Sequence, residues 1–178
     1  ETFGRRFRSE EFGGQIRAFV SLVKKQMPET AILLTTPPEC YKRTYVNKKR
    51  TYVRNSNTQL AAKAIVKAAH EEGVACWDLF AATGGKSSCT KWRKEKLMGR
   101  DRIHFTKDGY REQGTLLYRA LMQSYNQMLK IRNTLIHVYA GDVDKRYFKN
   151  ITEDFFELLQ QFRNKAEQWY QMDESDGR

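Results

Sequence analysis

Two short apolar runs, each preceded by a segment with helical periodicity, most constrain how this chain can fold. The segment from Ser9 to Met27 carries an apolar residue every three or four positions, and the apolar run Ala31–Thr35 follows it and stops at Pro37-Pro38. A second helical segment, which Asn57 is expected to cap and Gly73 to end, precedes the run Val74–Asp78. This alternation predicts an α/β fold with a parallel sheet. The expected apolar positions are Phe12, Ile16, Phe19, Val20, Val23 and Met27 in the first helix and Leu60, Ala61, Ala64, Ile65 and Ala68 in the second.

The ends of these strands predict where a site would form. Working loops in parallel sheets lie beyond the carboxyl ends of the strands. We therefore expect Thr35-Thr36-Pro37, Asp78-Leu79 and the loop from Asp101 to His104 to lie at one edge. Thr106 is expected to cap a last helix, and the segment from Glu39 to Asn55, which shows little periodicity, is expected to be an exposed loop. The apolar positions of the last helix include Tyr110, Leu117, Ala120, Leu121 and Met128.

The charge and the cysteines limit the classes of function. Among 178 residues, 32 Lys and Arg face 21 Asp and Glu, which gives a net charge of +11. A basic surface attracts nucleic acid, anionic glycans or acidic membranes, and it can equally serve solubility alone. No apolar run approaches the roughly 20 residues that span a bilayer. The cysteines Cys40, Cys76 and Cys89 form no C-x-x-C pair, so we expect neither a disulfide framework nor a zinc site.

A glycine pair invites a phosphate-loop interpretation that its spacing excludes. A P-loop needs a glycine five residues before Gly85-Lys86-Ser87, and Phe80 occupies that position. We therefore predict a glycine turn at Gly84-Gly85, with no nucleotide or other cofactor bound.

The pair Asp101 and His104 is the candidate catalytic feature. In acyl-transfer hydrolases a histidine takes the proton of a serine, and a carboxylate holds the imidazole in the required tautomer. A separation of three residues in a turn can bring both side chains to one side. The alternative is a capped turn with a surface histidine.

The order of several segments resembles the C-terminal half of an SGNH (GDSL-type) ester hydrolase, especially its bacterial carbohydrate-esterase-like members. The segments are Leu33-Leu34-Thr35-Thr36-Pro37-Pro38-Glu39, Gly73-Val74-Ala75-Cys76-Trp77-Asp78-Leu79 and Phe105-Thr106-Lys107-Asp108-Gly109-Tyr110 after Asp-x-x-His. The resemblance covers Glu1 to Leu129. It implies an incomplete flavodoxin-like three-layer α/β/α fold, Asp101 as the orienting carboxylate and His104 as the general base. It also implies a hydrolase of acyl or acetyl esters, acting on a small molecule or a carbohydrate, without metal or cofactor.

The resemblance also implies parts that this sequence does not contain. The family takes its nucleophile from a Gly-Asp-Ser segment, and its oxyanion hole uses the serine amide, a glycine amide and an asparagine from further segments. The start of the chain, Glu1-Thr2-Phe3-Gly4, resembles the sequence just after the Gly-x-Asn segment. The serines that are present lack the family context: Ser9, Ser21, Ser56, Ser87, Ser88, Ser124 and Ser175. We therefore expect this chain to be inactive alone unless another chain supplies the missing N-terminal half, and we expect an open sheet edge with uncovered apolar surface.

The residues from 130 to 178 form a predicted helical extension with a second resemblance. Arg132-Asn133-x-x-x-His137-x-Tyr139 is similar to the Arg-x4-His-x-Tyr element of HEPN-superfamily proteins, some of which are metal-independent RNases. The alternative site is therefore Arg132, His137 and Tyr139, with RNA as the partner. A packed histidine in a plain helical extension is the other interpretation, and a non-catalytic binding domain is a third. Members of the esterase family are often periplasmic or secreted, but no leader can be read from this chain.

Overall fold

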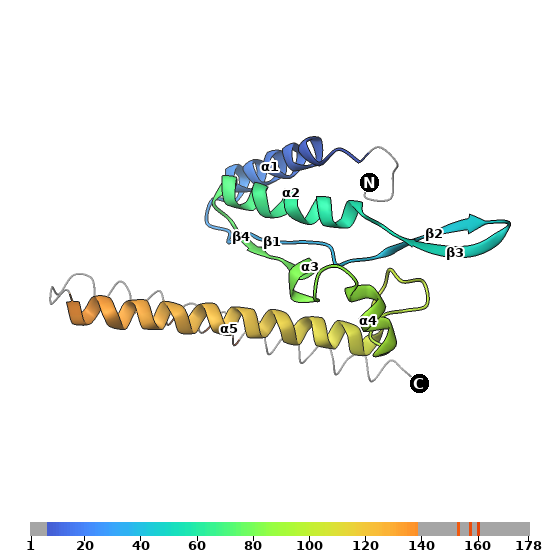
Figure 1. Cartoon of the computed structure of the whole chain (residues 1–178). Helices are drawn as coiled ribbons and strands as arrows, with labels where there is room; N and C mark the ends of the chain where they lie inside the picture. The colour runs from blue at the N-terminus through green and yellow to red at the C-terminus, as the bar shows by residue number, and fades with distance from the viewer. Residues whose placement is uncertain (1–6, 139–152, 154–156, 158–159, 161–178) are drawn as a thin grey trace, which may run out of the picture. The chain divides into compact units, whose positions relative to one another are not determined.

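The computed structural model describes residues 7–138, 153, 157 and 160, with side chains described as far as Lys130 and at the last three positions. Residues 1–113 form one compact unit and residues 114–178 form another. The elements, shown in Figure 1, are α1 (Ser9–Gln26), β1 (Leu33–Thr35), β2 (Tyr41–Val46), β3 (Lys49–Arg54), α2 (Asn57–Glu72), β4 (Ala75–Trp77), α3 (Leu79–Ala82), α4 (Ser88–Lys94) and α5 (Lys107–Val138).

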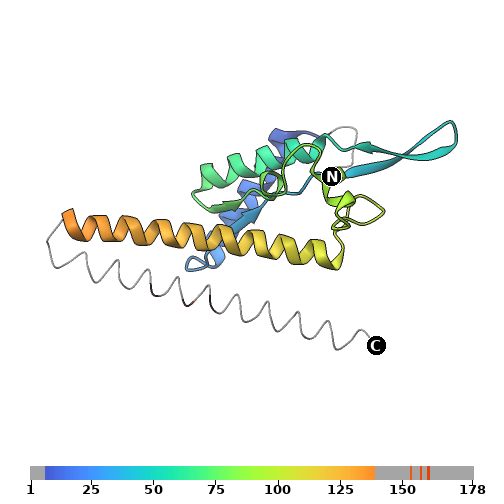
Figure 2. The same ribbon diagram turned by 60° about the horizontal axis from the view of Figure 1, so that its bottom comes forward.

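The central sheet of the first unit consists of β1 and β4, which confirms the predicted parallel pairing. Leu33 pairs with Ala75 and Thr35 pairs with Trp77. Helix α2 lies between these strands in the chain and contacts both of them, and α1 packs alongside α2 (Figures 1 and 2). The described residues of the first unit thus form an α/β structure with a parallel pair of strands, as the sequence predicted.

The contact between α1 and α2 is close because both helices present small residues there. Gly13 lies against Ala64, and Val20 of α1 is fully buried. Exposed ion pairs, such as Arg17 with Glu71 at 2.8 Å, border this contact. Four of the five predicted apolar residues of α2 are buried, and these are Ala61, Ala64, Ile65 and Ala68.

Three predicted apolar positions of these two helices are wrong. Phe19 is 63% exposed, Met27 is 51% exposed and Leu60 is 44% exposed. Periodicity identified the helices but made the predicted apolar stripe two positions too wide in the first helix and one position too wide in the second, because the narrow contact between small residues needs fewer large side chains. The strand residue Leu33 is also 42% exposed; the predicted open sheet edge with uncovered apolar surface stays a prediction.

The start and end of α2 show one correction and one confirmation. Asn57 is the first helical residue and not the cap, which is Ser56. The Asn57 amide donates to the side-chain oxygen of buried Asn55 at 3.3 Å, so Asn55 accepts a hydrogen bond at the start of the helix. Gly73 adopts φ +61° and ends the helix as predicted, because only glycine takes this left-handed conformation without strain.

The segment from Glu39 to Asn55, predicted to be an exposed loop, is instead mostly a β-hairpin. Strands β2 and β3 pair antiparallel from Tyr41 opposite Arg54 to Val46 opposite Lys49. The two-residue turn, Asn47 and Lys48, has φ +49° and +61°, as a type I′ turn requires. The hairpin extends away from the N-terminal end of α2 (Figure 1). Its signal in the sequence is the repeat of Thr-Tyr-Val at 44–46 and 51–53, on either side of that turn.

The glycine turn predicted at Gly84-Gly85 is confirmed, and it joins two short helices, α3 and α4, that the sequence did not predict. Both glycines have positive φ, +106° and +66°. Asp78 caps α3 by accepting a hydrogen bond from the Ala81 amide at 3.2 Å. These short helices place Trp92 in the core, where its indole donates to the Thr83 carbonyl at 3.0 Å.

The last described helix, α5, begins as predicted and runs through the predicted boundary between Leu129 and Lys130. The Thr106 hydroxyl oxygen accepts from the Gly109 amide at 3.2 Å and so caps the first turn. The division into a hydrolase-like part and a tail at 129/130 stays a prediction. Among the described helices, none combines the length and the hydropathy that crossing a bilayer requires.

Candidate active site

The loop that carries Asp101 and His104 is closed at both ends by backbone hydrogen bonds. Met98 and Phe105 form an antiparallel bridge, and the Gly99 amide donates to the His104 carbonyl at 2.8 Å. A Cβ at Gly99 would lie 3.1 Å from the His104 carbonyl oxygen and 3.2 Å from the Asp101 carboxylate, so any side chain here would crowd the pair. The loop is therefore a tight, fixed turn, which suits residues that must hold a set geometry.

Within the loop, the aspartate and histidine contact each other directly. His104 Nδ1 lies 2.6 Å from Asp101 Oδ2, and Asp101 Oδ1 accepts from the amides of Ile103 at 3.0 Å and His104 at 3.1 Å. Partial burial opposes ionisation of Asp101, but these hydrogen bonds outweigh it and hold the pKa of the carboxyl below its usual value. Asp101 is therefore an ionised acceptor near neutral pH.

This geometry determines which nitrogen of His104 can act as a base. Because an ionised carboxylate only accepts hydrogen bonds, the proton of the neutral imidazole lies on Nδ1 and the lone pair on Nε2. Among the described residues no group is hydrogen-bonded to Nε2, and the side chain is 71% exposed. The pair is thus arranged as the orienter and base of a hydrolase require, with the basic nitrogen open to solvent.

The sheet edge gathers two of the three segments that the sequence placed there. The Thr36 hydroxyl donates to Asp78 at 2.8 Å and accepts from the Phe80 amide at 2.9 Å. The third segment, the loop from Asp101 to His104, is joined to the residues that follow β1 by a hydrogen bond from the Tyr41 amide to the Arg102 carbonyl at 3.0 Å. The loop of Asp101 and His104 is therefore anchored on the base of the hairpin.

A buried carboxylate that sequence reasoning did not single out as functional holds this region together. Glu39 is 1% exposed and accepts from the backbone amides of Ser87 at 2.9 Å and Cys89 at 3.1 Å. Its other neighbour is Arg54 at the hairpin base, with 3.7 Å between Nε and Oε1. Glu39 thereby joins β3 to the start of α4. Its position just after a double proline was the only available signal.

The three free cysteines of the first unit are not suited to replace a serine nucleophile. Burial raises the pKa of Cys40, Cys76 and Cys89, and nearby carboxylates add to the effect. The pKa of Cys89 rises to about 12, chiefly through burial and then through Glu39. A thiol with so high a pKa stays protonated near neutral pH and is a poor nucleophile.

Arg102, also missed from the sequence, lies between the hairpin and the loop. Its guanidinium carbon is 5.3 Å from the centre of the Tyr41 ring and 4.7 Å from that of Tyr52. Its backbone has φ +58°, a conformation that a non-glycine residue adopts only when neighbouring contacts hold it. The two cation–π contacts supply such a hold.

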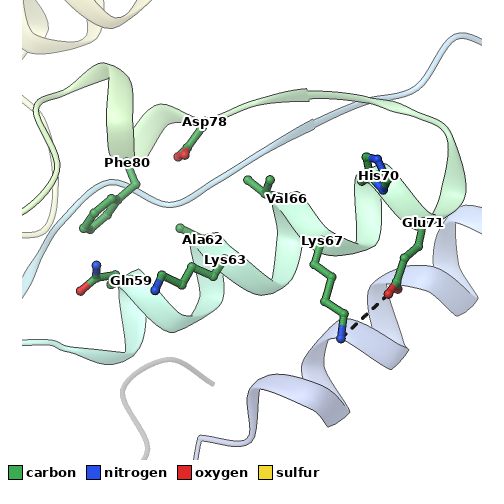
Figure 3. A pocket seen from close by; sticks show the side chains of 9 residues that line it. All are labelled: Gln59, Ala62, Lys63, Val66, Lys67, His70, Glu71, Asp78 and Phe80. Carbon is green, nitrogen blue, oxygen red and sulfur yellow. Dashed lines mark ion pairs between the residues drawn. The ribbon is translucent and has the colours of Figure 1, made fainter.

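A cavity of the first unit that lies along α2 contains neither residue of the pair. This groove of about 540 Å³ lies along α2 beside β4 and α3, with Val66, His70, Asp78 and Phe80 in its walls and the Lys67–Glu71 ion pair at its rim (Figure 3). The candidate catalytic pair instead lies on an open surface. Residues 7–130 hold no cluster of three or more His, Cys, Asp or Glu side chains placed to bind a metal ion.

The alternative site in the tail lies outside what the structure describes. Arg132 and His137 fall in α5 beyond the last described side chain of that helix, and Tyr139 lies outside the described residues. The HEPN-like interpretation therefore stays a prediction.

Comparison of the fold with solved structures identifies its kind. A peptidoglycan O-acetylesterase superimposes with a TM-score of 0.61 at 21% identity, over 69% of this chain and 34% of the other. The fold is esterase-like. An esterase domain of the ORF1 protein from the zebrafish ZfL2-1 retrotransposon also matches, with a TM-score of 0.46 at 17% identity, over 66% of this chain and 61% of that domain. The chain spans about a third of the O-acetylesterase's length. No protein-family profile and no curated protein matches the sequence.

Proposed function

We propose that this chain is the general-base part of an SGNH-type ester hydrolase, with His104 as the base and Asp101 as its orienter. The observation that carries this proposal is the 2.6 Å contact between His104 Nδ1 and Asp101 Oδ2 in a closed loop, with Nε2 open to solvent. The esterase-like fold supports it. A capped turn with a surface histidine would not need an imidazole whose second nitrogen is held ready to accept a proton.

The proposed reaction proceeds in two steps. His104 Nε2 removes the proton of a serine hydroxyl as the serine oxygen bonds the ester carbonyl carbon, and the imidazolium then protonates the departing alcohol. In the second step, water adds to the acyl-enzyme while His104 accepts its proton, and the imidazolium returns that proton to the serine oxygen as the acyl C–O bond breaks and the acid is released. Asp101 stabilises the imidazolium in both steps.

The serine has to come from a segment that this sequence does not contain. No Gly-Asp-Ser occurs in the 178 residues, and no described serine hydroxyl is hydrogen-bonded to His104. We propose that further residues of the same polypeptide, or a second chain, supply the serine and the oxyanion donors. By analogy with the O-acetylesterase, the substrate class is an acetyl or other acyl ester on carbohydrate.

Hydrolysis of p-nitrophenyl acetate tests the proposal in two proteins. The chain as given should release p-nitrophenol no faster than its His104→Ala variant, because no nucleophile is present. A protein that also includes the coding frame upstream of Glu1 should turn over, and His104→Ala or Asp101→Asn should then lower kcat by about 10⁴-fold or more. Release of acetate from an acetylated polysaccharide would identify the substrate class.

His70→Ala is the matched control, since His70 is an exposed histidine on α2. It should leave the rate unchanged. Turnover by the chain alone well above its His104→Ala variant would overturn the claim that the nucleophile lies elsewhere. An active longer protein that is indifferent to His104→Ala would overturn the assignment of the base.

A further inference from the structure

Strands β2 and β3 sort their side chains onto two unlike faces. Residues directly opposite each other in an antiparallel pair share a face, and neighbours along a strand alternate between faces. The register therefore places tyrosines and arginines together on one face, which we name the Tyr/Arg face: Tyr41, Arg43, Tyr45, Arg50, Tyr52 and Arg54. The opposite face carries Lys42, Thr44, Val46, Lys49, Thr51 and Val53.

The Tyr/Arg face carries positive charge that little else in the structure compensates. The segment from Tyr41 to Arg54 contains no acidic residue. Arg54 pairs with Glu39, whereas Arg43 and Arg50 are exposed and form no ion pair within the described residues. Arg50 instead lies over the Tyr52 ring at 5.4 Å and donates to its hydroxyl at 2.5 Å. Tyr45, which pairs across the strands with Arg50, is 62% exposed.

The positive surface continues from the hairpin base onto α4. Arg102 stacks on Tyr41 and Tyr52 and also lines a pocket of about 220 Å³. Arg93 and Lys94 of α4 line the same pocket, and neither forms an ion pair within the described residues. The pocket therefore gathers cationic side chains at a place where an oxyanion could be held.

We propose that the Tyr/Arg face and this pocket bind single-stranded nucleic acid. Arginine guanidinium groups match phosphate oxygens in a two-point geometry, and exposed aromatic rings stack on unpaired bases. The face supplies both groups side by side, and the pocket supplies a place for one phosphate. Figures 1 and 2 show that the hairpin projects from the rest of the first unit, so an extended strand can lie along it.

The tyrosines decide which polyanion fits this surface. A duplex keeps its bases stacked inside, so Tyr45 would gain no stacking partner from it. An acidic polysaccharide or peptide satisfies the arginines but presents no base to the ring. The proposal does not depend on ester hydrolysis, since none of its residues is Asp101 or His104, and it does not involve the tail residues Arg132 and His137.

Fluorescence anisotropy with the whole chain tests the proposal. The probe is a fluorescein-labelled oligothymidylate longer than the roughly 4–16 nucleotides that such sites cover, first at about 50 mM salt. Binding is expected, and its affinity should fall steeply with salt. Arg43→Ala with Arg50→Ala should weaken binding by more than about 10-fold and make the logarithmic salt slope shallower by about 1.4, which is about 0.7 for each lost phosphate contact.

The opposite face of the same hairpin provides the matched control. Lys42→Ala with Lys49→Ala removes the same charge from the other face and should change affinity by less than about 2-fold. Tyr45→Ala should weaken binding by about 5- to 150-fold through lost stacking, whereas Tyr45→Phe should bind like the original chain. Thermal unfolding followed by circular dichroism checks that every variant folds.

Three results would overturn the proposal. The first is no binding of the oligonucleotide at about 50 mM salt. The second is an equal loss from the arginine and the lysine pairs, which would mean that net charge alone drives association. The third is preferential binding of an acidic polysaccharide such as heparin that is unaffected by Tyr45→Ala, which would assign the face to an anionic glycan.

Discussion

Replacing Glu39 with glutamine tests how the site is held together. The carboxylate accepts from the Ser87 and Cys89 amides, at 2.9 and 3.1 Å, in a position that is 1% exposed. Hydrogen bonds to a charged acceptor contribute about 1.5–3 kcal/mol each. Glutamine keeps one acceptor oxygen, now uncharged, and turns its NH₂ group toward the other amide.

The expected loss of unfolding free energy follows from these contacts. One charge-assisted hydrogen bond is replaced by two donors facing each other, and the other bond becomes neutral, so we expect a loss of about 3 kcal/mol. The pair with Arg54 adds little, because its 3.7 Å contact involves a side chain that is 42% exposed. For a chain of 178 residues, this loss corresponds to a decrease in Tm of about 6–12 °C.

Urea unfolding followed by tryptophan fluorescence measures the loss of unfolding free energy, since Trp77 and Trp92 are both buried in the first unit. Glu95→Gln is the control, because it removes the same charge from an exposed position at the end of α4. It should change the free energy of unfolding by less than about 0.5 kcal/mol. A loss below about 1 kcal/mol for Glu39→Gln, or equal losses for both variants, would refute the role given to this carboxylate.

Three further changes probe the elements around the site. Gly109→Ala should destabilise the protein by about 1–3 kcal/mol in thermal unfolding, because the new Cβ would overlap the Leu97 carbonyl. Gly114→Ala has nothing within 4 Å of the new Cβ and should stabilise the protein by about 0.5–1 kcal/mol in the same assay. Thr36→Val should cost about 1–3 kcal/mol in urea unfolding, since the hydroxyl makes two hydrogen bonds at the sheet edge, and the exposed Thr35→Val should be close to neutral. Asp101 has a lowered pKa when folded, so its contribution to stability is full above the ordinary value of 3.8 and is lost as pH falls through the folded pKa. The stability difference between the original chain and Asp101→Asn should therefore shrink as pH falls below 3.8, and a constant difference would contradict the assignment.

Local signals in the sequence predicted the parts of the fold that depend on local chemistry. Gly73 ends α2 and Thr106 caps α5 because both effects act within one turn of helix. The contact between Asp101 and His104 was predictable for the same reason, since it spans three residues.

Features built from distant residues were not predictable in this way. The amides that Glu39 binds lie 48 and 50 residues further along the chain, so only the double proline before it distinguished this residue in the sequence. The hairpin was missed because Asn47-Lys48 is a weaker turn signal than Asn-Gly, and because the basic residues concealed the strand pattern. Arg102 acquires its role only once the hairpin brings Tyr41 and Tyr52 to it.

The closed base of the hairpin has a consequence for how this protein can change. The Asn55 amide donates to the Cys40 carbonyl at 3.0 Å, so the chain leaves and re-enters the first unit at one point. Adding or removing two residues on each side of the turn would change the length of the hairpin and keep every side chain on its own face. Such a change would leave the pairing of β1 with β4 untouched. The length of the β2–β3 hairpin can therefore vary without a change in the loop that holds Asp101 and His104.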